Sequence, residues 1–149
     1  MKINRFAIPA VVAVIVLAYG ISGSNPHATI HVVEHAVTDT VADIAPAGDS
    51  IGDVLGFANP VFDEENQNQV GTDNGHCIRT AVGSAWECSW TVLLPKGQIT
   101  VEGPFYDTKD SVLAITGGTG AYNQARGQMT LHARNNLGTE YDFTYEVVK

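Results

Sequence analysis

Apolar and polar residues alternate one by one along most of this chain, and turn-forming residues separate the alternating segments. In the segment 140–148, large apolar residues occupy every second position: Tyr141, Phe143, Tyr145 and Val147. A period of two is typical of a β-strand that buries one face. The pattern predicts eight strands, at 29–37, 53–62, 69–79, 85–94, 98–106, 111–116, 125–133 and 140–148. No helical period is sustained after residue 24.

Short turns join most of these predicted strands, among them 95–97, 107–110 and 135–138. Eight short antiparallel strands favour closure into a barrel, because closure leaves no unpaired strand edge. The interior of such a barrel is filled by side chains or holds one small ligand. A packed β-sandwich has the same periodicity, so alternation alone leaves both folds open. The turn-type residues Asp73, Asn74 and Gly75 suggest an interruption of the third strand.

The N-terminal segment has the composition of a secretory signal peptide. Lys2 and Arg5 precede an apolar run over 6–19, and small residues follow up to Ser24. The run is shorter than the ~20 residues that span a bilayer, although an uncleaved anchor stays an alternative. We therefore expect a signal peptide at 1–24, a single domain at 25–149 and a secreted protein. A signal peptide this short suits a bacterium.

The charge balance is acidic, with 8 lysines and arginines against 16 aspartates and glutamates and a formal net charge of −8. An acidic chain has no basic patch with which to hold nucleic acid or anionic lipid. We expect neither a nucleic-acid partner nor, after signal cleavage, a membrane partner. A homodimer or homotrimer stays open.

Two cysteines, Cys77 and Cys88, flank one turn signal at 82–84. A hairpin centred on that turn places Arg79 opposite Trp86 and Cys77 opposite Cys88. Directly opposed residues of antiparallel strands lie within bridging range, and an even number of cysteines in a secreted protein favours a disulfide. We predict a Cys77–Cys88 disulfide, and the alternative is one reactive thiol.

The glycine cluster 117–120 superficially suggests a phosphate-binding loop. Such a loop opens onto a helix and carries a lysine, but no Gly-Lys-Ser/Thr motif follows and the next residues have strand character. We interpret the cluster as a tight turn. His27, His31 and His35 are also a weak signal, because His31 and His35 on one strand lie about 13 Å apart. The sequence predicts no metal site.

Four blocks of the sequence, at 52–62, 70–77, 97–105 and 110–128, resemble the allene oxide cyclase and dirigent-like barrel family. The resemblance implies an eight-stranded antiparallel β-barrel over nearly all of the chain from about residue 30. It implies a barrel that binds a small apolar molecule and steers its coupling or cyclisation without a cofactor. The alternative is a true cofactor-free cyclase, an isomerase, because one fold hosts several functions.

The resemblance also implies individual site residues. Glu34 matches the glutamate that, in the plant cyclases, helps to open an epoxide and stabilises developing positive charge. On sequence alone, an exposed glutamate at a strand edge is an equal alternative. Asn59 matches a lumen asparagine, Cys77 a cyclase cysteine that a disulfide would remove as a thiol, and Ala36 replaces a second asparagine. The expected ligand contacts are Asn59, Phe57, Phe105, Trp90 and Tyr145.

Overall fold

The computed structural model describes residues 27–148, so the predicted signal peptide lies outside the described residues. Nine β-strands and one short 3-10 helix, η1 (Gly120–Tyr122), make up this part of the chain. The strands are β1 (His27–His35), β2 (Thr40–Ala42), β3 (Val54–Phe62), β4 (Gln69–Ala81), β5 (Ala85–Leu94), β6 (Gly97–Tyr106), β7 (Ser111–Gly118), β8 (Arg126–Ala133) and β9 (Glu140–Val148). Within 27–148, no helix has the length and apolar character needed to cross a membrane.

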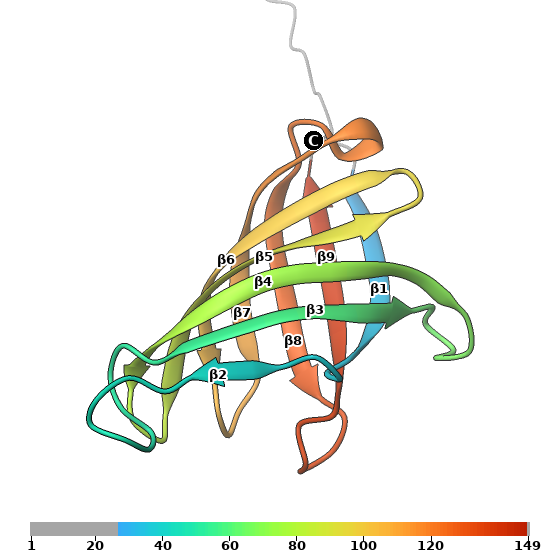
Figure 1. Cartoon of the computed structure of the whole chain (residues 1–149). Helices are drawn as coiled ribbons and strands as arrows, with labels where there is room; N and C mark the ends of the chain where they lie inside the picture. Colours follow the sequence, from blue (N-terminus) through green and yellow to red (C-terminus); the bar gives the residue numbers. More distant parts are fainter. Residues whose placement is uncertain (1–26, 149) are drawn as a thin grey trace, which may run out of the picture.

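The strands close into an eight-stranded antiparallel barrel (Figure 1), which confirms the predicted fold class. The sheet order is β1-β9-β8-β7-β6-β5-β4-β3-β2, and a further pairing between β1 and β3 closes the cylinder. This seam is short, with Val33 opposite Phe62 and Glu34 opposite Val61. β2 continues the sheet on the free edge of β3, outside the closed ring.

Two details of the predicted strand pattern are wrong. β4 runs without a break through Asp73 and Gly75, because those residues pair with β3 on one side and β5 on the other. β2 was not predicted, since its three exposed residues carry no alternation and are held only by pairing with β3. Tertiary pairing overrides local preference in both cases.

The hairpin of β4 and β5 has the predicted register, with Cys77 opposite Cys88 and Arg79 opposite Trp86. The register shifts only beyond Arg79, next to the turn. The predicted disulfide joins Cys77 to Cys88 and is buried. It closes a loop with a sequence separation of 11 residues, which on chain-entropy grounds stabilises the fold by ~2–3 kcal/mol.

The glycine cluster 117–120 forms the end of β7 and the start of η1, as expected for a turn. Gly120 has a φ of 59°, and a Cβ there would lie 2.6 Å from the carbonyl oxygen of Lys96. A side chain at this position would clash with backbone, so glycine is required. After the three-residue η1 the chain enters β8 rather than an α-helix, so the cluster does not have the geometry of a phosphate loop.

One end of the barrel gathers the β1–β3 connection and the turns β4–β5, β6–β7 and β8–β9 (Figure 1). Arg79 of β4 links the β1–β3 connection, the β6–β7 turn and β5. Its Nε lies 2.6 Å from Asp49, its Nη1 lies 2.9 and 2.7 Å from the two carboxylate oxygens of Asp107, and its guanidinium stacks 4.0 Å over Trp86. A buried arginine therefore connects the segments at this end of the barrel.

Candidate functional site

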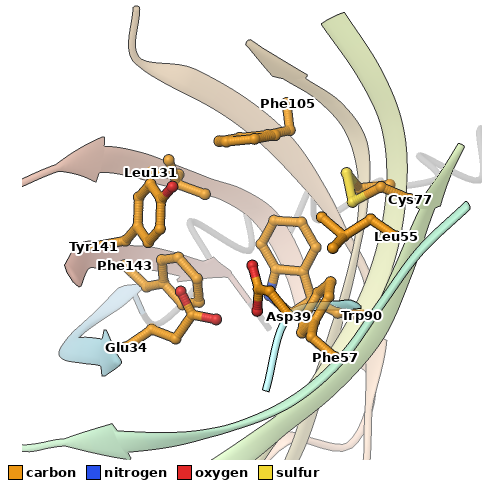
Figure 2. Close-up of a pocket in the computed structure, with 11 residues that line it drawn as sticks. Glu34, Asp39, Leu55, Phe57, Cys77, Trp90, Phe105, Leu131, Tyr141 and Phe143 are labelled. Carbon is orange, nitrogen blue, oxygen red and sulfur yellow. A yellow bond between two sulfur atoms is a disulfide. The ribbon is translucent and has the colours of Figure 1, made fainter. Parts of the chain in front are cut away.

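A cavity of about 40 Å³ lies inside the barrel, toward the end that carries Arg79. Five aromatic side chains line it, as Figure 2 shows: Phe57, Trp90, Phe105, Tyr141 and Phe143. Leu55, Leu131 and the Cys77–Cys88 disulfide complete the apolar lining. Two carboxylates, Glu34 and Asp39, point into the same space. The site is thus an apolar, aromatic chamber with acidic groups on one side.

Glu34 lies on β1 at the closing seam, opposite Val61 of β3 and Tyr141 of β9. Its side chain is only 5% exposed. The alternation of β1 turns Glu34 inward with Val32, which decides between the two readings left open by the sequence in favour of the lumen.

Asn59 holds the acidic side of the cavity together. Its Nδ2 donates to Oε1 of Glu34 at 2.6 Å and to Oδ1 of Asp39 at 2.7 Å. Its Oδ1 accepts from the backbone N–H groups of Val37 and Thr38 and from the Thr38 hydroxyl. Both amide hydrogens are therefore engaged by carboxylates, and Asn59 positions these groups rather than offering a free donor to a ligand.

Burial raises the pKa of Glu34 from 4.5 to about 7. The hydrogen bond from Asn59 works against this shift, and the nearby Asp39 carboxylate adds to it. Desolvation disfavours the charged form, so Glu34 titrates near neutral pH instead of being fully ionised. A group poised in this range suits proton transfer or the stabilisation of charge.

A second buried acid, Asp73, lies on β4 directly opposite Asn59. It is 0% exposed, and burial together with the Glu34 charge raises its pKa to about 9. The two acids are close enough to affect each other's titration. The pair therefore retains a proton near neutral pH.

The aromatic wall depends on Gly75, the β4 residue that pairs with Phe57 and with Trp90. A Cβ at Gly75 would lie 2.2 Å from the Trp90 Cβ and 2.7 Å from the Phe57 ring. Without that Cβ, the two rings meet edge to face with centroids 6.0 Å apart. The rings of Trp90 and Phe143 also pack together, with their centroids 5.5 Å apart. The missing side chain at Gly75 thus creates the space that the aromatic wall occupies.

The structure brings most of the expected site residues together. Glu34, Phe57, Trp90 and Phe105 line the cavity, and Asn59 lies behind its acidic side. Cys77 lines it as half of a disulfide, so it offers no thiol.

Tyr145, also an expected ligand contact, is fully buried and does not line the cavity. Its hydroxyl has no hydrogen bond of normal geometry to a described residue, and burial and Asp73 raise its pKa well above the usual value.

Three residues of the site were missed from the sequence. Tyr141 shares its inward face with Phe143 and Tyr145, so the alternation of β9 already contained its signal. Asp73 has the appearance of a turn residue, and only the continuous pairing of β4 turns it into the lumen. Asp39 lies on the connection between β1 and β2, where no pattern predicts direction.

Two histidines of β1, His31 and His35, are engaged away from the cavity. Nε2 of His31 lies 3.0 Å from Asp142, and Nε2 of His35 lies 2.7 Å from Asn66. Among residues 27–148, no three histidine, cysteine or acidic side chains are grouped as a metal would require.

A larger cavity of about 530 Å³ adjoins the inner one at the barrel rim. The two cavities share Phe105, Leu131 and Tyr141. The outer cavity is formed by the β6–β7 and β8–β9 turns and is more polar than the inner one. The inner cavity therefore meets the rim at these three residues.

Comparison with solved structures shows that other proteins have this barrel. A protein described as pyocyanin demethylase is 26% identical, with a TM-score of 0.68 over 78% of this chain and 98% of that one. The pterocarpan synthase dirigent protein PsPTS1 is 16% identical, with a TM-score of 0.65 over 83% and 94%. The exo-specific intermolecular Diels-Alderase AbnU is 12% identical, with a TM-score of 0.65 over 83% and 99%.

The match to a known family is direct and covers most of the barrel. Residues 33–138 match the family model described as allene oxide cyclase. The matched segment includes Glu34, Asn59, Asp73 and the disulfide, and ends just before β9. The chain belongs to the allene oxide cyclase family.

Proposed function

We propose that this protein is a secreted, cofactor-free isomerase that closes or rearranges a small, mostly apolar molecule in its lumen. The observation that carries the proposal is Glu34, a carboxyl group 5% exposed, poised near neutral pH and facing an aromatic cavity. An apolar wall folds the substrate into a reactive conformer, which removes part of the entropic barrier. The ionised Glu34 then stabilises positive charge that develops on the substrate.

Tyr141 supplies a proton donor that complements the Glu34 carboxylate. Its side chain lines both cavities and lies opposite Glu34 in the β1–β9 register. Burial, with the charges of Glu34 and Asp39, raises its pKa to about 12, so its hydroxyl stays protonated throughout the physiological range. A protonated phenol can donate to an oxygen that leaves with the bonding electrons, while Glu34 faces the carbon that becomes electron-poor.

Related proteins support this choice of chemistry. The family is described as allene oxide cyclase, and solved structures of the same fold are described as a dirigent protein and a Diels-Alderase. The demethylase shares the fold at 26% identity, so chemistry other than cyclisation also occurs on it. Secretion is supported by the Cys77–Cys88 disulfide, because such bonds persist in oxidising compartments.

Styrene oxide is a suitable probe, since its ring opening needs the same two groups. The benzylic C–O bond breaks and its electron pair stays on oxygen, which takes a proton from Tyr141. A hydride shift to the benzylic cation, with return of the proton, gives phenylacetaldehyde, an isomer. We expect consumption of styrene oxide to increase as the pH rises through about 7. We expect Glu34→Gln to slow consumption on the order of tenfold to a thousandfold.

The matched control is Glu87→Gln, which removes the same charge from an exposed position on β5. Its rate should equal that of the wild type. An unchanged rate in Glu34→Gln would favour a second candidate function, a dirigent-type binding scaffold. One observation favours that candidate: the inner cavity of about 40 Å³ is far smaller than a typical ligand pocket, so a ligand would lie mostly at the rim, away from Glu34.

A further inference from the structure

We infer that the lumen and the adjoining rim favour an aromatic ligand that carries a positive charge on a mostly apolar framework, and that they reject carboxylate ligands. A bicyclic ligand exceeds the inner cavity of about 40 Å³, so it occupies the outer cavity as well. This inference names the substrate class of the proposed site and rests on that proposal for the location of binding.

The charged residues that line the inner cavity are all acidic. Glu34 and Asp39 line it, and no lysine, arginine or histidine is among the described residues that do so. The buried cation at this end of the barrel, Arg79, is engaged by Asp49 and Asp107. An anionic ligand would therefore be desolvated beside two carboxyl groups with no counter-charge, whereas a cation would be paired.

The aromatic wall favours the same sign of charge. Five of the eleven lining residues carry aromatic rings. The face of an aromatic ring is electron-rich, and it attracts a cation most strongly where water is excluded. Rings together with carboxylates form the usual environment of a bound ammonium-type group, and a flat ligand also stacks against the rings.

Asp73 adds a second buried acid to this side of the lumen. It lies on the inward face of β4, in line with Gly75 and Cys77, and is 0% exposed. Glu34 is close enough for the two carboxyl groups to interact directly. An anionic ligand would therefore be placed beside a pair of buried acids, whereas a cation would be attracted to them.

The rim does not reverse this preference. Its two basic groups are already engaged: Nδ1 of His132 lies 2.7 Å from Asp110, and Nζ of Lys109 lies 4.1 Å from the centre of the Tyr106 ring. Asp107 and Asp110 also line the outer cavity. A ligand that enters through the rim therefore meets no unengaged cation among the described residues of either cavity.

Three bicyclic probes of similar shape test the inference by calorimetry in mildly alkaline buffer: N-methylquinolinium, neutral quinoline and 1-naphthoate. We expect N-methylquinolinium to bind on the order of tenfold more tightly than quinoline, and 1-naphthoate to bind most weakly. Glu34→Gln and Asp39→Asn should each weaken N-methylquinolinium binding several-fold and leave quinoline binding nearly unchanged. Using both variants keeps the test valid if one of them fails to fold.

Glu87→Gln distinguishes the lumen from general attraction to an acidic protein. It should leave the affinity for N-methylquinolinium unchanged, and an equal loss in this variant would overturn the inference. Equal affinities for the three probes, or tightest binding of 1-naphthoate, would overturn it as well. The proposed activity can be rejected independently of this inference. If the protein prefers the cation but consumes styrene oxide at a rate that does not depend on Glu34, the isomerase proposal is rejected and the inferred ligand class stands.

Discussion

The Nδ2 atom of Asn59 lies 2.6 Å from a carboxylate oxygen of Glu34, across the seam that closes the barrel. This one hydrogen bond links the closure of the fold to the electrostatics of its lumen. Asn59 lies on β3 and Glu34 on β1, the two strands whose pairing completes the cylinder. Because the same amide also holds Asp39, the position of both acids depends on barrel closure.

Replacing Asn59 should therefore weaken the fold itself. Asn59→Ala removes two donors from carboxylates and one acceptor from the Val37 and Thr38 N–H groups. We expect the free energy of unfolding to fall by about 2–4 kcal/mol, because buried polar groups are left unpaired. Urea denaturation measures this loss. The surface variant Asn136→Ala should change stability by less than about 0.5 kcal/mol, and a similar small change for Asn59→Ala would contradict the role of this residue.

The raised pKa of Glu34 predicts an unusual dependence of stability on pH. The folded state holds its proton up to about 7, but the unfolded state releases it near 4.5. The folded protein thus binds more protons in this interval, so the free energy of unfolding decreases as the pH rises from 4.5 and the loss is complete above about 7. Its upper bound is ~3 kcal/mol. Asp73, whose pKa is raised from 3.8 to about 9, adds to the decrease over the same interval and extends it to higher pH.

Glu34→Gln should flatten the lower part of this decrease and raise stability at pH 8, since an uncompensated buried charge is removed. Urea denaturation of wild type and variant at several pH values provides the comparison. A variant whose stability falls as steeply as that of the wild type between pH 4.5 and 7 would show that Glu34 does not titrate as described.

Gly75 should tolerate no side chain. Gly75→Ala places a Cβ 2.2 Å from the Trp90 Cβ, so the strands or the aromatic wall must move. We expect a loss of about 2–3 kcal/mol in the free energy of unfolding, typical of overpacking. Gly56→Ala is a matched control on the neighbouring strand, because nothing lies within 4 Å of its Cβ position. Thermal denaturation of the two variants should separate them clearly, and equal melting temperatures would refute the steric argument.

The disulfide should be fully formed and stabilising in the purified protein. Alkylation followed by mass spectrometry should find no free thiol before reduction and two afterwards. The double variant Cys77→Ala/Cys88→Ala should lose ~2–3 kcal/mol of stability. Reduction of the wild type should produce a similar loss, while leaving the double variant unaffected. Two thiols that react without reduction would contradict the bond.

The sequence by itself determined the strands, and its resemblance to a known family indicated that they close into a barrel. Alternation at period two defined seven of the nine strands closely, and the turn at 82–84 fixed the register that pairs Cys77 with Cys88. These features are local: each depends on which face of a strand is apolar and on where the chain reverses. The alternation of β9 even contained Tyr141, although its position in the site was not recognised.

Tertiary structure alone decided the chemistry of the lumen. The burial of Glu34 and its hydrogen bond to Asn59 depend on closure between β1 and β3, which are separated by a long connection. The inward position of Asp73 depends on the unbroken pairing of β4 with both of its neighbours. A titration near neutral pH arises from burial and neighbouring charges, and neither is encoded in a local pattern. The sequence supplied the acids and the rings, and closure of the barrel enclosed them together.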